Sequence, residues 1–181
     1  MNHQYPQSNP GTYVSSLRCE TLDAARVGST DTAILRFGSI GTPAGTGLAV
    51  TDSAANGTVV EIQRPGLYAC KLRSGAAGTV PTALAISLNT DAAGLNAVPS
   101  LSLSGQEDFL QVEGAVPPFN LAGVAMTCLV AVTQADIDAG VTAGATGAQV
   151  RFHGRLTSDV DATNLSDANS SMTVQRVASL F

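Results

Sequence analysis

Residues 56–73 decide the fold and read Asn-Gly-Thr-Val-Val-Glu-Ile-Gln-Arg-Pro-Gly-Leu-Tyr-Ala-Cys-Lys-Leu-Arg. In the first half of this stretch, Val60 and Ile62 alternate with Glu61 and Gln63. A period of two is typical of a strand that turns one face to a core and the other face to water. We therefore expect a strand in which Val60 and Ile62 are buried and Glu61 and Gln63 are wet.

The second half repeats the pattern after Pro65-Gly66. Proline lacks the N–H that a strand ladder needs and glycine relieves the backbone, so this pair marks a strand boundary. Beyond the pair, Tyr68, Cys70 and Leu72 share one face of the next strand. The stretch therefore predicts two strands that meet at a turn.

Short strands of the same kind follow along the chain, separated by turns rich in glycine and serine. They are expected at Ser15–Glu20, Thr32–Phe37, Gly47–Thr51, Thr58–Arg64, Leu67–Arg73, Ala83–Leu88, Leu101–Leu103, Phe109–Glu113, Val124–Thr133, Gln149–Leu156 and Met172–Val177. Evenly spaced short strands predict an all-β jelly-roll sandwich of about ten antiparallel strands with an extended N-terminal arm. The one helical turn expected starts at Gln134 and ends at Gly140.

The longest expected strand, Val124–Thr133, is apolar on both of its faces. Cys128 and Val130 lie on one face, whereas Leu129 and Ala131 lie on the other. Such a strand is either central in its sheet or covered by a second subunit as well as by its own core. Both alternatives stay open at this point.

The N-terminal segment, residues 1–17, has no Asp, Glu, Lys or Arg. Its prolines oppose a helix and its low hydrophobicity opposes independent packing. One interpretation is a frayed terminus, and the other is an arm that docks on a partner through Tyr5, Tyr13 and Val14. We divide the chain into this arm, residues 1–17, and a jelly-roll domain, residues 18–181.

Charge is sparse and excludes some classes of partner. The chain has 181 residues and a formal net charge of −5, and its nine basic residues are scattered. No cluster of them follows a phosphate backbone, so we expect no nucleic-acid partner. We expect no membrane partner either, because no apolar run reaches the roughly 18 residues of a spanning helix. The start of the chain also lacks the charged-then-apolar layout of a signal peptide.

The three cysteines, Cys19, Cys70 and Cys128, are far apart and odd in number. This pattern argues against a disulfide framework or a zinc site. Cys70 and Cys128 each lie on the apolar face of an expected strand, where a free cysteine behaves as a small core hydrophobe. We expect no cofactor.

The block Pro65-Gly66-Leu67-Tyr68, preceded by Gly57, Val59 and Ile62, resembles the globular-head family of complement and tumour-necrosis-factor-like proteins. In that family a strand leads into Pro-Gly-x-Tyr and then into a second strand. The segments Leu84–Asn89 and Val174–Val177 are similar to later strands of the family. The collagen-like Gly-X-Y stalk is absent from this chain.

The resemblance implies a jelly roll that forms tight homotrimers, with Tyr68 facing the threefold axis. Leu129 and Ala131, on the second apolar face of Val124–Thr133, complete the expected trimer interface. Domains of this kind are also widespread in bacteriophage virion proteins. The resemblance therefore implies a virion protein as well as a fold.

Candidate catalytic residues are few. Of the two histidines, His3 lies in the arm, and His153 is expected to face solvent or an interface. A serine hydrolase needs a serine beside an oriented histidine, and no Gly-x-Ser-x-Gly elbow is present. An enzyme would have a deep polar pocket around His153, and we expect none.

Two loops resemble ligand sites only at first sight. Gly41–Gly47 lacks the Lys-Ser/Thr of a phosphate-binding loop and is expected to be a turn. Asp159–Asp167 offers oxygen ligands at alternate positions but lacks the Gly and Glu of an EF-hand. We expect a solvated acidic loop there, with a calcium site as the alternative.

These observations favour a structural protein that is not an enzyme. We expect a trimeric capsid decoration protein on the phage virion, which grips the shell of major capsid protein through its N-terminal arm. The alternative is a tail-fibre or spike tip that binds a host-surface receptor through Gly38–Gly47 or Thr157–Ser171.

Overall fold

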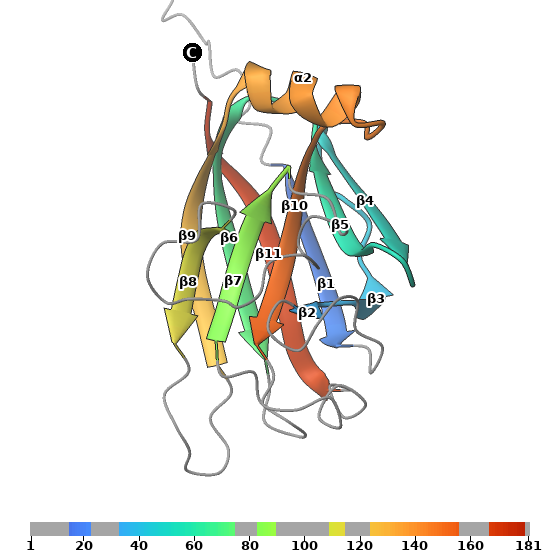
Figure 1. Ribbon diagram of the computed structural model, residues 1–181, viewed down its shortest axis with the longest axis vertical. Coiled ribbons are helices and arrows are strands. Elements are labelled where there is room, and N and C mark those ends of the chain that lie inside the picture. The colour runs from blue at the N-terminus through green and yellow to red at the C-terminus, as the bar shows by residue number, and fades with distance from the viewer. Residues whose placement is uncertain are drawn as a thin grey trace, which may run out of the picture.

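Two antiparallel sheets lie face to face in the computed structural model, which describes residues 15–22, 33–74, 83–89, 109–114, 124–155 and 167–179 (Figure 1). Sheet A has the order β3 (Phe37–Ile40), β1 (Ser16–Leu22), β11 (Asp167–Ala178), β6 (Gly66–Ser74) and β9 (Val124–Val132). Sheet B has the order β4 (Leu48–Ser53), β5 (Gly57–Ile62), β10 (Ala148–Arg155), β7 (Ala83–Leu88) and β8 (Phe109–Gly114), and β2 (Ala33–Ile34) also pairs with β10. The predicted all-β jelly-roll sandwich is confirmed.

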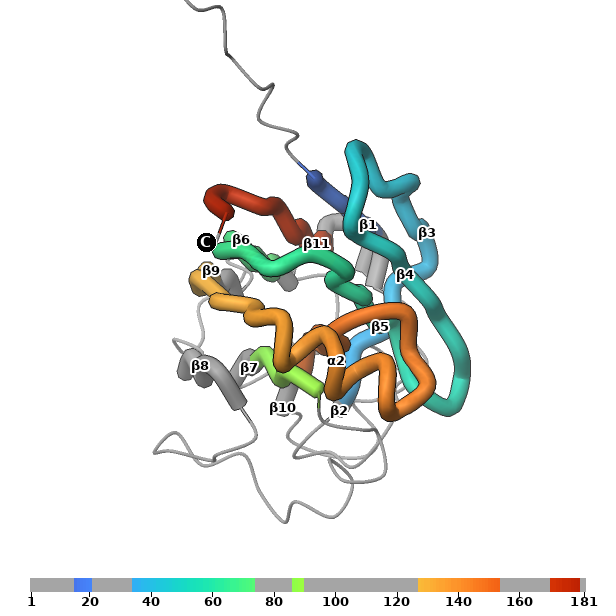
Figure 2. Tube along the Cα trace, turned by 90° about the horizontal axis from the view of Figure 1, so that it is seen from above, coloured from blue at the N-terminus to red at the C-terminus, as the bar shows by residue number. Residues whose placement is uncertain are grey.

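The core fills the space between the two layers that Figure 2 shows from above. Alternate residues of each strand point into it, as the period-two pattern predicts. Its members from sheet A include Leu17, Cys19, Tyr68, Cys70, Leu72, Cys128, Val130, Val132, Met172 and Val174, and those from sheet B include Val60, Ile62, Ile86, Ala148, Val150 and Phe152. All three cysteines are free and buried. The expected burial of Cys70 and Cys128 is confirmed, and Cys19 joins them in the core.

The segment Thr32–Phe37, predicted as one strand, is divided between the two sheets. β2 pairs with β10 in sheet B, whereas β3 pairs with β1 in sheet A. Two hydrogen bonds hold the chain where it crosses between the sheets. Leu35 N donates to the backbone Phe152 O at 2.9 Å, and Phe37 N donates to the side-chain Thr58 Oγ1 at 2.9 Å. The prediction of a single strand was wrong because both halves are apolar and the sheet change leaves no local signal.

The predicted helical turn is present but longer. Helix α2 (Gln134–Thr142) starts at a capping box, in which Thr133 and Asp136 satisfy each other's backbone N–H groups, and it crosses the end of the sandwich (Figure 1). Gly140 was predicted to end the helix, but it lies inside α2. It is buried against the next strand, and a Cβ at this position would lie 2.0 Å from Gly147 O. Gly140 therefore serves close packing, and it does not cap the helix.

The body of the domain begins earlier than the predicted boundary after residue 17. Ser16 opens β1, Leu17 is buried in the core, and Ser15 O accepts a hydrogen bond from Arg176 N at 2.9 Å. The predicted strand Leu101–Leu103 lies outside the described residues. No helix in the described part of the chain is long and apolar enough to cross a membrane.

Candidate functional site

The outer face of sheet A carries an apolar patch over β6, β9 and the end of β11. We define the apolar patch as Leu67, Ala69, Leu129, Ala131 and Val177. The strand register joins these residues, because Ala69 lies opposite Leu129 and Leu67 lies opposite Ala131. Val177 lies at the β11 bulge beside Ala178, which pairs with Leu67. The patch is therefore continuous across three strands.

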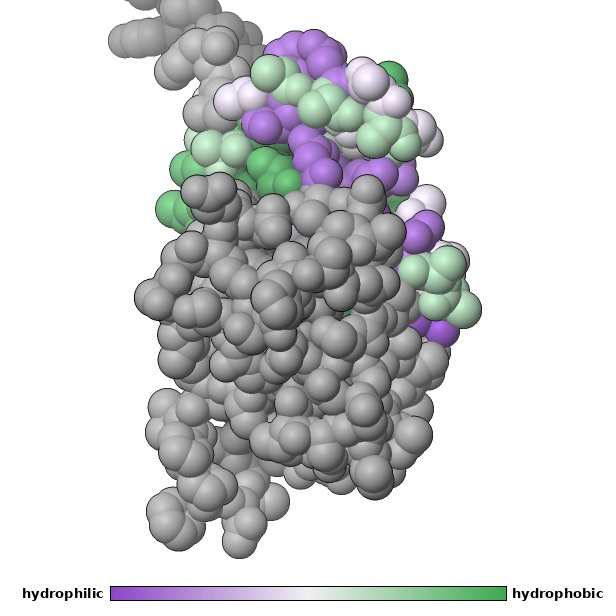
Figure 3. Space-filling view, in the orientation of Figure 1, coloured by the Kyte–Doolittle hydropathy of each residue, from purple (hydrophilic) through white to green (hydrophobic). Residues whose placement is uncertain are grey.

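The patch is open to solvent in a single copy. Leu129 is 62% exposed and Val177 is 45% exposed, which are high values for large apolar side chains. Figure 3 shows hydrophobic atoms on the side of the molecule where β9 lies in Figure 1. Contiguous exposed apolar surface of this kind marks an interaction site.

β9 is also an edge strand, with β6 as its neighbour in the described sheet. This position rules out the central location that its two apolar faces allowed. Edge strands of single-copy proteins are commonly protected by charges, proline or bulges. The nine residues of β9 contain no charge and no proline, and their pairing with β6 is regular.

In β9, the residues that form the patch also point their backbone N–H and C=O groups toward this free edge. Ser16 and Ala44 exchange two backbone hydrogen bonds, so the N–H and C=O groups of Ser16 point away from β11. In an antiparallel pair of strands, opposed residues that are hydrogen-bonded to each other alternate with opposed residues that are not. Following this alternation from β1 through β11 and β6 makes Cys70 and Cys128 a hydrogen-bonded pair. The N–H and C=O groups of Leu129 therefore face away from β6, toward the edge.

The other end of the same face is cationic. We define the cationic end as Arg18, Lys71 and Arg73, which are all exposed. Arg18 Nε binds Glu20 Oε1 at 2.7 Å, whereas no described carboxylate pairs with Lys71 or Arg73. Sequence reasoning missed both residues as site candidates, although they occupy the strand face opposite Tyr68, Cys70 and Leu72.

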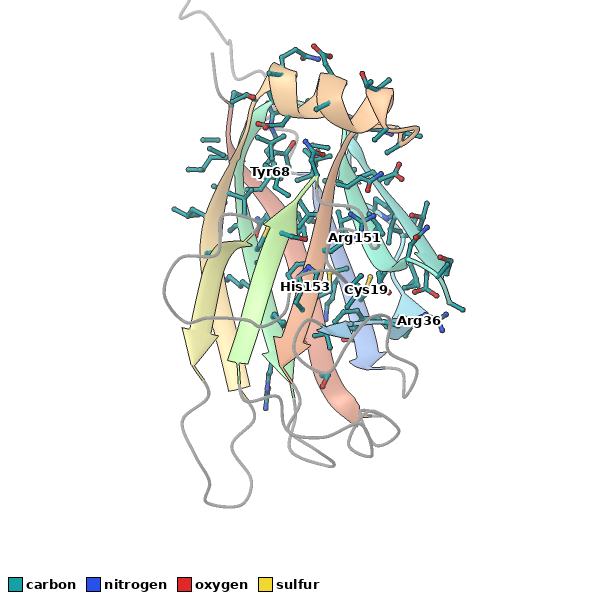
Figure 4. All side chains as sticks on the ribbon, in the orientation of Figure 1. Cys19, Arg36, Tyr68, Arg151 and His153 are labelled. Carbon is teal, nitrogen blue, oxygen red and sulfur yellow. The ribbon has the colours of Figure 1, made fainter. Side chains whose placement is uncertain are left out.

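Tyr68 is not on this face. Its side chain is 0% exposed in the core between the sheets (Figure 4), and its hydroxyl donates to Arg64 O at 2.7 Å. Burial raises the pKa of the Tyr68 hydroxyl above its ordinary value. The implied position at a threefold axis is therefore corrected: the alternation that buries Cys70 and Leu72 also buries Tyr68. Leu129 and Ala131 remain as the exposed members of the predicted interface.

His153 was expected to face solvent or an interface, and the first of these options is wrong. It is 0% exposed on the outer side of β10 (Figure 4), and its Nε2 lies 2.7 Å from the Oγ of Ser87, which is also 0% exposed. The distance suits a nucleophile and base. However, neither side chain is accessible to a substrate, so the hydrogen bond joins β7 to β10 in the buried interior.

Other charged groups on the outer side of sheet B are buried too. Glu61, predicted to be wet, is only 6% exposed and accepts hydrogen bonds from Thr146 N, at 3.1 Å, and from Thr146 Oγ1. Arg151 is 4% exposed, and its Nη2 donates to Gln149 Oε1 at 2.7 Å. Glu61 is thus bonded by the loop before β10, and Arg151 is bonded by a neighbour on its own strand. The period-two pattern shows which side a residue faces, and it does not show whether that side is covered.

The remaining sequence candidates are not placed. Tyr5, Tyr13 and Val14 of the arm lie outside the described residues, as do Asp159 and Asp161. Among the described residues, no group of three or more His, Cys, Asp or Glu side chains is arranged to hold a metal ion.

Comparison with known proteins finds structural likeness only. No family model matches the chain, and no curated protein sequence matches it. Two crystal structures of murine APRIL, one at pH 8.0 and one at pH 5.0, each align with a TM-score of 0.49 and 13% sequence identity, covering 91% of this chain and 99% of the APRIL chain. APRIL has the jelly-roll fold of the tumour-necrosis-factor family, which the Pro65–Tyr68 block resembles.

Proposed function

We propose that this chain is a structural protein without enzymatic activity, and that it assembles as a homotrimer to decorate a bacteriophage head. The observation that carries the proposal is the uncharged edge strand β9 with its exposed Leu129. Such a strand, with apolar side chains and free backbone groups at one edge, is covered when a second copy packs against it.

A contact of one copy's β9 edge with the neighbour's apolar patch is heterologous, because the two surfaces differ. Heterologous contacts close into rings when the rotation permits. Three copies are the number that the resemblance of the Pro65–Tyr68 block implies. Leu67 and Ala69 are half-buried and add small apolar area beside Leu129.

The two ends of the described body support the decoration role. Ser15 and Arg176 are hydrogen-bonded neighbours, so the arm that precedes Ser15 begins at the same end of the sandwich where β11 finishes. In a trimer, three arms would therefore leave from one end. Three weak grips on a capsid shell combine through avidity, and Tyr5, Tyr13 and Val14 are the proposed contacts.

The tail-tip alternative assigns receptor binding to Gly38–Gly47 or Thr157–Ser171, and most of the second loop lies outside the described residues. The first loop, Gly38–Gly47, is described in full. That loop is tied to the sandwich, because Ala44 pairs with Ser16 and Gly47 O accepts from Gln63 N at 2.9 Å. Its backbone thus serves the fold, which favours the decoration role.

Two measurements test the proposal. Light scattering on the purified protein should give the mass of a trimer, and a monomer at micromolar concentration would refute the assembly. Full-length protein and protein lacking residues 1–14 should then be added to undecorated heads at low and high salt. We expect only the full-length protein to bind, and to bind at both salt concentrations because the arm is uncharged. Equal binding of the two forms would refute the role of the arm.

A further inference from the structure

We propose that Cys70 and Cys128 form a reversible disulfide bridge under oxidising conditions, which joins the edge strand β9 to β6. The inference concerns the core face of these two strands and does not depend on the trimer proposed above.

The first step is the placement of the two thiols. Cys70 and Cys128 are far apart in sequence, which is why the spacing of the cysteines argued against a disulfide framework. The fold brings them together, because Cys70 on β6 lies directly opposite Cys128 on β9. Both side chains belong to the core, where they are 0% and 8% exposed, respectively. Directly opposed side chains project from the same face of a sheet, so the two sulfur atoms are neighbours.

The second step is the spacing of the strands. Cys70 and Cys128 are a hydrogen-bonded pair, in which the Cα atoms lie about 5.5 Å apart. Disulfides join Cα atoms that are about 4.4–6.8 Å apart, so this pair lies within reach. Cys19 is the internal comparison. Strand β11 separates its strand from β6, which places Cys19 two strand spacings, about 9.5 Å or more, from Cys70 and outside that range.

The third step is the reversibility of the bridge. The Cβ atoms of a directly opposed, hydrogen-bonded pair lie about 5.5 Å apart, whereas those of a disulfide lie about 3.8 Å apart. Bridging therefore draws β9 toward β6, and a bridge that distorts its surroundings is easier to reduce. β9 can make this movement because it is an edge strand, with β6 as its neighbour in the described sheet.

The fourth step is access to the thiols. Burial raises the pKa of the Cys70 thiol, and the nearby Cys128 raises it further, so the thiols of the native protein react slowly. Oxidation therefore takes place as the chain folds or when the edge strand β9 opens locally.

The fifth step is the chemistry, in which the oxidant is a small disulfide such as oxidised glutathione. One cysteine thiolate attacks this disulfide, which forms a mixed disulfide and releases one small thiol. The second cysteine thiolate attacks the protein sulfur of the mixed disulfide and releases the other small thiol. The small disulfide thus takes up two electrons, and the two protons of the cysteine thiols leave on the two small thiols.

The bridge would act next to the apolar patch. Leu129 follows Cys128 on β9 and projects from the opposite face of the strand. A bridge at Cys128 would therefore fix β9 to the sheet beside Leu129 without changing the apolar surface itself. The redox state would set how firmly the strand that carries Leu129 and Ala131 is held.

Refolding of the full-length protein from urea tests the inference, with oxidised glutathione compared with dithiothreitol. In oxidised glutathione we expect an intact mass that is lighter by two hydrogen atoms. Non-reducing peptide mapping should link Cys70 to Cys128 and leave Cys19 as a thiol. The bridged protein should have a Tm about 5 °C or more above that of the reduced protein, and dithiothreitol should reverse both the mass change and the Tm change.

Two variants provide the controls. Cys19→Ala should keep the bridge and the Tm difference between the two redox states, whereas Cys128→Ala should lose both. Each variant is compared with itself in the two states, so its altered core packing does not enter the difference. If Cys128→Ala fails to fold, the peptide map of the wild-type protein decides.

The other outcomes would overturn the inference. Wild-type protein that refolds in oxidised glutathione with three thiols, with glutathione on separate cysteines, or with a bridge to Cys19 would show that Cys70 and Cys128 do not pair. A bridged protein without a gain in Tm would show that the bridge does not hold β9 to the sheet.

Discussion

Replacing Leu129 with serine should dissociate the proposed trimer without unfolding the protomer. Leu129 is 62% exposed in a single copy, so its side chain adds little to the protomer's own core. Burying a whole leucine side chain is worth about 1.5–3 kcal/mol, and burying the exposed part of Leu129 is therefore worth roughly 1–2 kcal/mol per copy. Summed over a trimer, the loss is about 3–6 kcal/mol, which corresponds to about two to four powers of ten in the association constant.

Sedimentation equilibrium over a wide concentration range measures that constant, and urea unfolding of the separated protomer measures its stability. Val141→Ser is the matched control, because Val141 is 52% exposed on α2, away from the apolar patch. The control should remain trimeric. Leu129→Asp should dissociate the trimer more completely than serine does, since it would bury an unpaired charge. A Leu129→Ser protein that associates as tightly as wild type would refute the placement of the interface.

Three further predictions concern the protomer. The hydrogen bond and charge of Arg36 hold the pKa of Asp52 below its ordinary value, so the stability from this pair is present at neutral pH and is lost as the pH falls below about 4. Urea unfolding against pH should show a smaller acid loss for Asp52→Asn than for wild type, and an equal loss would contradict the assignment. Burial raises the pKa of the Cys70 thiol, so a thiol reagent such as Ellman's should react with it only on unfolding, and fast labelling of native protein would contradict its burial. Ser87→Ala removes the partner of His153 Nε2 and should lower the free energy of unfolding by about 1–3 kcal/mol, whereas an unchanged urea midpoint would show that the pair does not stabilise the fold.

Much of the sandwich was predictable because strand periodicity is local. The alternation in residues 56–73 correctly buries Val60, Ile62, Cys70 and Leu72. It also buries Tyr68, against the location at an axis that the family resemblance implied. Where pattern and resemblance disagreed about a single side chain, the pattern was the better guide, since it follows directly from strand geometry.

The errors occurred where distant segments decide the outcome. Nothing local shows that the chain changes sheets between Ile34 and Phe37, because both are buried apolar residues. Nor does the alternation show that the outer side of β10 is covered at Arg151 and His153. The sequence placed His153 at solvent or an interface, but the folded chain buries both side chains and gives them hydrogen-bond partners.

The sequence by itself determined the all-β class, the burial of Cys70 and Cys128 and the two apolar faces of Val124–Thr133, because each depends on the order of side chains along one strand. Only the tertiary structure decided that β9 stands at the edge of its sheet, since its place depends on pairing with β6, which is distant in sequence. That pairing leaves Leu129 exposed and aligns Lys71 and Arg73 with the apolar patch on one face. The candidate site is thus a product of strand order, and strand order is a property of the folded chain.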